Sequence, residues 1–113
     1  MKPKLLTKEL TSEQKQRLNA IYRMLIPGTT KEEISATFDI SERQARDYVS
    51  YIKKVKPVIA TSAMKGYKIA RTMADLELAK QTAREIKSRI EDLNECYKPL
   101  IEFIEKAERY EQQ

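Results

Sequence analysis

Two helix starts in the middle of the chain constrain the fold more than any other feature of the sequence. Ser41 is a favourable N-cap, and Gln44 three residues later completes a capping box, in which each side chain bonds the backbone N–H of the other residue. Thr30 and Glu33 repeat this pattern further upstream. The sequence therefore predicts two short helices joined by a tight turn.

The second of these helices, over residues 42–54, is amphipathic. Ala45, Val49 and Ile52 fall on one face at positions i, i+4 and i+7. The other faces carry basic and polar residues, namely Arg43, Gln44, Arg46, Asp47, Ser50, Lys53 and Lys54. A capped second helix with such an outer face is typical of a helix-turn-helix, whose second helix enters the DNA major groove and reads base edges.

The segments before this helix supply apolar residues that can pack against it. The helix over residues 31–37 offers Ile34, and the turn after it offers Phe38 and Ile40. A further helix is predicted over residues 12–26, with Ser12 or Thr11 as its N-cap and Pro27-Gly28 as its end. Its apolar stripe is made by Leu18, Ile21, Tyr22 and Leu25.

A β-hairpin is predicted after the second helix. Residues 58–61 and 67–70 are rich in β-branched and aromatic side chains, and the loop between them contains Gly66, which can adopt a positive φ. Such a hairpin would form a wing beside the helix-turn-helix. Lys65, at its tip, and Lys68 are the candidates for phosphate contacts on this wing.

The run from Ser41 to Ala70 resembles the winged helix-turn-helix of the biotin-repressor type. The resemblance rests on the serine N-cap, on the aliphatic triplet of the second helix, and on the sequence Gly66-Tyr67-Lys68-Ile69-Ala70. It covers roughly residues 12–71 and implies a DNA-binding domain there, preceded by an arm over residues 1–11. The expected fold is mainly α with a small β-hairpin, followed by a long helix in residues 72–113.

This C-terminal segment has an unbroken heptad pattern of apolar residues. The seam consists of Leu76, Ala79, Ala83, Ile86, Ile90, Leu93, Tyr97, Leu100, Ile104 and Ala107. A seam of more than four heptads is hard to bury inside so small a domain, so we expect a coiled coil between two copies of the chain. The alternative is that the helix folds back over its own winged helix as a fourth core helix.

Three features near the end of the seam modify this expectation. Pro99 removes a backbone donor, so the helix should kink near Glu95 or break and restart at Pro99. The segment 100–104 is apolar on more than one face, which predicts a contact beyond one coiled-coil partner. Cys96 lies next to the seam and is expected to be a buried small hydrophobic residue.

Charge is distributed unevenly along the chain. Residues 1–72 hold 15 Lys and Arg against 7 Asp and Glu, a net charge of +8, whereas residues 73–113 hold 7 against 10, a net charge of −3. This is the charge distribution that a phosphate-binding module with a separate, neutral-to-acidic assembly helix would show. The alternative is that the basic surplus only keeps a small domain in solution.

Several classes of function find no support in the sequence. The chain has no histidine and one cysteine, which excludes a Cys/His zinc site, a Ser-His-Asp triad and an intramolecular disulfide. Neither a phosphate-binding glycine loop nor another catalytic motif is present, so we expect neither an enzyme nor a cofactor. No apolar run is long enough to cross a membrane, and residues 1–14 do not form a secretory signal. The expected compartment is the cytoplasm of a bacterial host cell.

Two functional hypotheses follow from these patterns. The first is a dimeric, sequence-specific protein that binds double-stranded DNA and regulates transcription or replication in a bacterium or phage. The second is a winged-helix adaptor or inhibitor that captures a host protein through residues 100–104.

Overall fold

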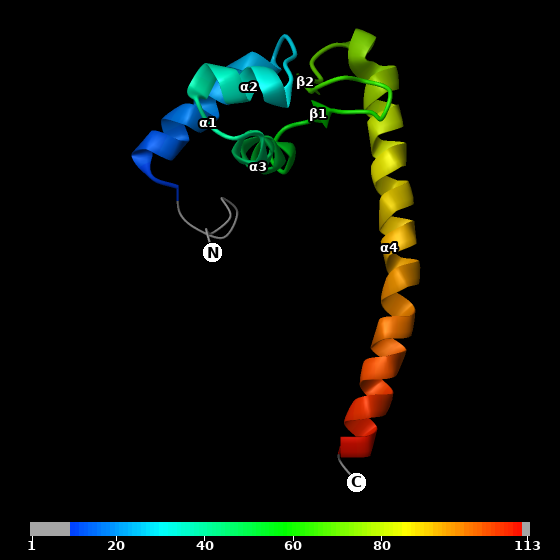
Figure 1. Ribbon diagram of the computed structural model, residues 1–113. Helices are drawn as coiled ribbons and strands as arrows, with labels where there is room; N and C mark the ends of the chain where they lie inside the picture. The colour runs from blue at the N-terminus through cyan, green and yellow to red at the C-terminus, as the bar shows by residue number, and fades with distance from the viewer. Residues whose placement is uncertain (1–9, 112–113) are drawn as a thin grey trace.

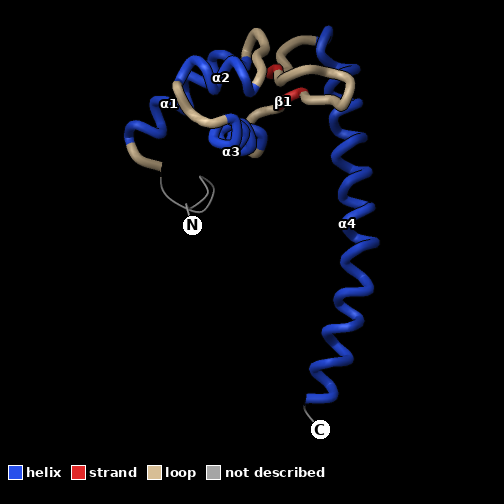
Figure 2. Tube along the Cα trace, in the orientation of Figure 1, coloured by secondary structure: helices blue, strands red, loops and turns tan. Residues whose placement is uncertain are grey.

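The chain is mainly helical and carries one small β-hairpin (Figures 1 and 2). The computed structural model describes residues 10–111, so nearly all of the expected N-terminal arm lies outside the described residues. The elements are α1 (Ser12–Leu25), α2 (Lys31–Phe38), α3 (Glu42–Lys53), β1 (Val58–Ile59), β2 (Lys68–Ile69) and α4 (Leu76–Glu111). A 3₁₀ turn, Met73–Asp75, leads into α4. This order confirms the predicted mainly α fold with a small β-hairpin and a long C-terminal helix.

Capping boxes begin each of the first three helices. The Ser41 hydroxyl accepts from the Gln44 N–H at 3.0 Å, and the Thr30 hydroxyl accepts from the Glu33 N–H at 3.1 Å, so both predicted boxes are confirmed. In α1 the cap is Thr11 and not Ser12. Since the caps satisfy backbone donors that the helix itself cannot, they define where each helix begins.

The core lies where the three short helices meet the hairpin. Its buried residues are Ile21, Leu25, Ile34, Ala45, Tyr48, Val49, Ile52 and Ile69. The predicted faces of all three helices are therefore confirmed, with Leu18, Tyr22, Phe38 and Ile40 packed partly buried around them. This packing turns the opposite face of α3 outward.

The hairpin is shorter than the sequence indicated. Only Val58 pairs with Ile69 and Ile59 with Lys68 in the antiparallel ladder. It gains width from Thr29, which exchanges two backbone hydrogen bonds of 2.9 and 2.8 Å with Tyr67. Gly66 has a φ of +104°, and a Cβ there would collide with the Thr29 carbonyl oxygen. The turn thus requires the glycine that the sequence places there.

Helix α4 runs away from the rest of the fold (Figure 1). Only its first turns contact the hairpin, where the Ala60 N–H donates to the Thr82 hydroxyl at 3.2 Å and the Ser62 N–H donates to Glu85 at 2.9 Å. The alternative of a fourth core helix is therefore wrong. The helix continues through Pro99 without a break, and Figure 1 shows a gentle curve in its C-terminal half. Of the two alternatives predicted for Pro99, the break with a second helix is therefore wrong.

Candidate nucleic-acid interface

The outer face of α3 brings together four of the nine residues that the sequence predicted for DNA contact. Arg43, Arg46, Ser50 and Lys54 are exposed and recur every three or four residues, so they follow one face of the helix. This face is directed outward because Ala45, Tyr48, Val49 and Ile52 are buried in the core. Figure 2 shows α3 almost end on, below α2. Two guanidinium groups on such a helix can each donate two hydrogen bonds to one base edge.

Gln44 and Asp47 lie at the margin of this face. The Gln44 side-chain oxygen accepts from the Ser41 N–H at 3.1 Å, so Gln44 helps to begin the helix. The Gln44 side chain is also half-buried. Asp47 is also half-buried. Within the described part of the chain it forms no ion pair with Arg43, although Arg43 lies four residues earlier on the same helix, a spacing that permits one. Arg43 is therefore not held by a carboxylate on its own helix.

Lys53 connects the end of α3 to the hairpin. Its ammonium nitrogen lies 5.3 Å from the centre of the Tyr67 ring, within the range of a cation–π contact. Burial lowers the Lys53 pKa, and the positive charge of Arg89 on α4 lowers it further. Burial also raises the pKa of Tyr67. Lys53 thus lies where the end of α3 meets the hairpin.

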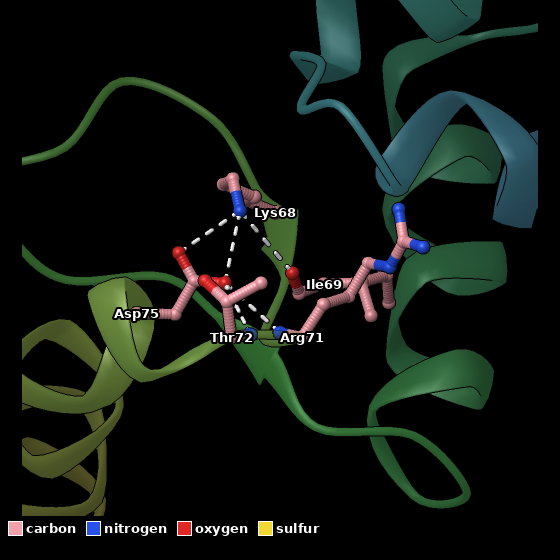
Figure 3. Close-up of polar contacts among 5 residues, drawn as sticks. All are labelled: Lys68, Ile69, Arg71, Thr72 and Asp75. Carbon is pink, nitrogen blue, oxygen red and sulfur yellow. Dashed lines mark hydrogen bonds and ion pairs between the residues drawn. The ribbon is translucent and has the colours of Figure 1, made fainter.

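Lys68 is bound at the base of the wing (Figure 3). Its ammonium group donates to both carboxylate oxygens of Asp75, at 3.0 and 3.1 Å. Asp75 is 7% exposed and also accepts from the backbone N–H groups of Arg71, at 2.9 Å, and Thr72, at 3.3 Å. The Arg71 N–H, and next the Lys68 ammonium group, lower the Asp75 pKa to about 2. Lys68 therefore stabilises the junction with α4. Because its ammonium group is already paired with Asp75, Lys68 is a weaker candidate for a phosphate contact than the sequence indicated.

Lys65 is exposed in the loop of the hairpin, as the sequence predicted. It is the wing residue most available to a phosphate group. Lys53 and Lys54, at the end of α3, are further exposed basic residues.

The seam of α4 is exposed in the single chain. Leu93 is 67% exposed, Tyr97 61% and Leu100 62%, values that are high for large apolar side chains. Phe103 lies beside the seam and is 70% exposed. Cys96 is exposed too, so the expectation that it is buried is wrong for the single chain.

Sequence reasoning missed the residues that join α4 to the wing. Asp75, Thr82 and Glu85 were not singled out, although Thr72 and Asp75 have the spacing of a capping box. Thr82 and Glu85 carry no comparable local signal, because their partners lie 22 and 23 residues away.

The described residues offer neither a metal-binding cluster nor a membrane-spanning helix. Within residues 10–111, no cluster of His, Cys, Asp and Glu could hold a metal ion. None of the helices among these residues has the length and apolar character needed to cross a membrane. Comparison with models of known protein families, with curated proteins and with solved structures gave no match to this chain.

Proposed function

We propose that this chain is a winged helix-turn-helix protein that binds double-stranded DNA in a sequence-specific manner. The observation that carries the proposal is the face of α3, where Arg43, Arg46, Ser50 and Lys54 are exposed on a helix fixed by its cap and its buried side. A capped helix with this composition suits the major groove. The family resemblance seen in the sequence points to the same class of protein.

The residues divide into two roles. Arg43 and Arg46 are proposed to read base edges, with Ser50 beside them, because guanidinium groups pair with guanine in the major groove. Lys53, Lys54 and Lys65 are proposed to contact phosphates, which position a protein without reading sequence. Gln44 and Asp47 are secondary candidates for base contact, since both are half-buried.

Helix α4 is proposed to join two copies of the chain. Its exposed apolar seam is too long to remain in water, and it lies apart from the basic face of α3. A dimer would present two recognition helices to two half-sites of one DNA duplex. Such a protein would act as a regulator of transcription or replication in the cytoplasm of a bacterium or of a phage-infected cell.

One observation favours a second candidate function. Phe103, at 70% exposure, lies outside the seam and would not be fully covered by one coiled-coil partner. An adaptor that binds a host protein through residues 100–104 would use it directly. This candidate needs no DNA contact from α3.

The test is a selection of random duplex DNA by the purified chain at about physiological salt. We expect one enriched motif from the wild-type chain and none from a variant with Arg43→Ala and Arg46→Ala. The matched control replaces two exposed basic residues of α4, Lys80→Ala and Arg84→Ala, and should retain the motif. Weak retention of all sequences by every variant would leave only non-specific electrostatic binding and contradict the proposal.

A further inference from the structure

The two halves of α4 differ in net charge. Between residues 76 and 90 the helix carries four Lys and Arg against two Asp and Glu, a net charge of +2. Between residues 91 and 111 it carries three against seven, a net charge of −4. The helix dipole adds partial positive charge at the N-terminus and partial negative charge at the C-terminus. The two halves of the helix are therefore complementary to each other in charge.

The sizes of the seam residues are also complementary between the two halves. The small residues Ala79 and Ala83 lie in the N-terminal half. The large residues Tyr97, Leu100 and Ile104 lie in the C-terminal half. A close-packed interface needs large side chains opposite small ones.

From these two patterns we propose that a second copy of the chain covers the seam in the antiparallel sense, centred between Ile90 and Leu93. The inference deepens the dimer of the proposed function and names its geometry. Every seam residue then opposes another seam residue across the interface. The layers are Leu76 with Ala107, Ala79 with Ile104, Ala83 with Leu100, Ile86 with Tyr97, and Ile90 with Leu93.

The parallel arrangement lacks these matches. It would place Ala79 and Ala83 against their own copies in consecutive layers, and Tyr97 against Tyr97 further along. The two layers of alanine favour a close approach of the helices that the tyrosine layer opposes. It would also align the basic halves with each other and bring the two basic winged helices, which both join α4 at its N-terminal end, side by side.

Antiparallel pairing also predicts what Phe103 contacts in the dimer. Residues at equivalent flanking positions face each other in an antiparallel pair, so Phe103 of one copy lies opposite Thr82 of the other. Thr82 is the residue whose hydroxyl accepts from Ala60 of the hairpin. Phe103 would therefore pack beside the partner's wing, and the two winged helices would lie at opposite ends of a seam about 47 Å long at 1.5 Å per residue.

Distances between spin labels on the full-length chain test this geometry. In a Cys96→Ser background, a label at Arg109→Cys would lie opposite residue 74 of the other copy, so the two labels would be roughly 50 Å apart at 1.5 Å per residue. In a parallel pair the two labels would lie at the same height along the helices. Their distance would then be less than about half of the antiparallel value, since the axes of packed helices are roughly 10 Å apart. The matched control, Asp92→Cys, lies at the centre and should give a short distance in either sense. Both positions are exposed in the single chain.

A long distance at residue 109 with a short distance at residue 92 supports the proposal. Short distances at both positions overturn the antiparallel sense, and no dipolar coupling at either position overturns the pairing itself. None of these outcomes bears on DNA readout by α3, which the selection experiment measures separately.

Disulfide trapping with a mixture of two chains of different length provides an independent test. One chain carries Ala83→Cys, the other carries Leu100→Cys, and both carry Cys96→Ser. We expect most of the covalent product to be the mixed pair. Predominant trapping of each chain with its own copy would overturn the proposal.

Discussion

Lys68 and Asp75 form an ion pair, 3.0 Å between Nζ and Oδ1, that joins strand β2 to the start of α4. The Asp75 carboxylate also receives the backbone N–H groups of Arg71 and Thr72, so four hydrogen bonds converge on one buried side chain. Two further contacts, from Thr82 and Glu85 to the hairpin backbone, complete the junction. The hairpin and the base of α4 are thus joined by side-chain contacts from both elements.

The first prediction concerns the pH dependence of this junction. Asp75 has a folded pKa of about 2 against an ordinary value of 3.8, so its carboxylate stabilises the fold fully above pH 3.8 and loses this effect as the pH falls to about 2. Asp75→Asn should therefore lower the melting temperature clearly at pH 6 and much less at pH 2. The control is the exposed Asp92→Asn, measured by circular dichroism at both pH values. An equal loss from Asp75→Asn at both pH values would contradict this account.

The second prediction concerns the N-cap of α3. Ser41→Ala removes the hydroxyl that accepts from the Gln44 N–H, and it should cost about 1 kcal/mol of unfolding free energy. Urea denaturation measures this loss. Ser88→Ala, in the exposed middle of α4, should leave stability almost unchanged. Similar effects from both changes would show that the cap contributes little.

The third prediction compares the two glycines. Gly66 and Gly28 both have a positive φ, but only at Gly66 does an added Cβ collide with backbone, namely the Thr29 carbonyl. Gly66→Ala should therefore destabilise the chain by more than about 1 kcal/mol, and by more than Gly28→Ala. Thermal unfolding of the two variants checks this order, and the reverse order would contradict the close approach of Gly66 to Thr29.

The fourth prediction separates base readout from phosphate contact. Arg43→Ala should cost about 1–3 kcal/mol on the selected DNA site and relax the preference at one base position. Lys65→Ala should weaken binding to all sequences and reduce the salt slope by about one. Fluorescence anisotropy on matched and mismatched duplexes distinguishes them. A uniform loss from Arg43→Ala would reassign Arg43 to a phosphate contact.

The fifth prediction concerns assembly. Leu93→Glu introduces a charge at the centre of the seam and should convert the dimer to a monomer in sedimentation equilibrium. The control Ser88→Glu adds the same charge outside the seam and should remain a dimer. DNA affinity should fall for Leu93→Glu alone, because a single recognition helix reads one half-site. A wild-type chain that is already monomeric would refute the assembly proposed for α4.

How much could be predicted depended on how local the signal was. The boxes at Thr30 and Ser41 rest on residues three apart, so the sequence was sufficient to define both helix starts. The pair of Arg43 with Asp47 also has a local spacing, but spacing only permits an ion pair and does not fix side-chain rotamers. Pro99 removes one hydrogen-bond donor, and the long helix continues despite that loss.

The junction between the wing and α4 could not be predicted in the same way. The contact of Ser62 with Glu85 spans 23 residues and forms only once the hairpin has placed α4. The ion pair of Lys68 depends on the same packing, because its partner Asp75 lies in the turn before α4. The α3 face was predictable because it follows from the helical period alone.

The most direct test of the central claim is photo-crosslinking from α3 to the selected DNA site. In a Cys96→Ser background, a photoreactive group is attached to Ser50→Cys on the outer face of α3, or to Glu13→Cys on the exposed start of α1 as the control. We expect the group on residue 50 to crosslink to bases at one fixed position in each half-site, and the group on residue 13 to give no base-specific product. Crosslinks from residue 13 with none from residue 50 would contradict recognition by α3.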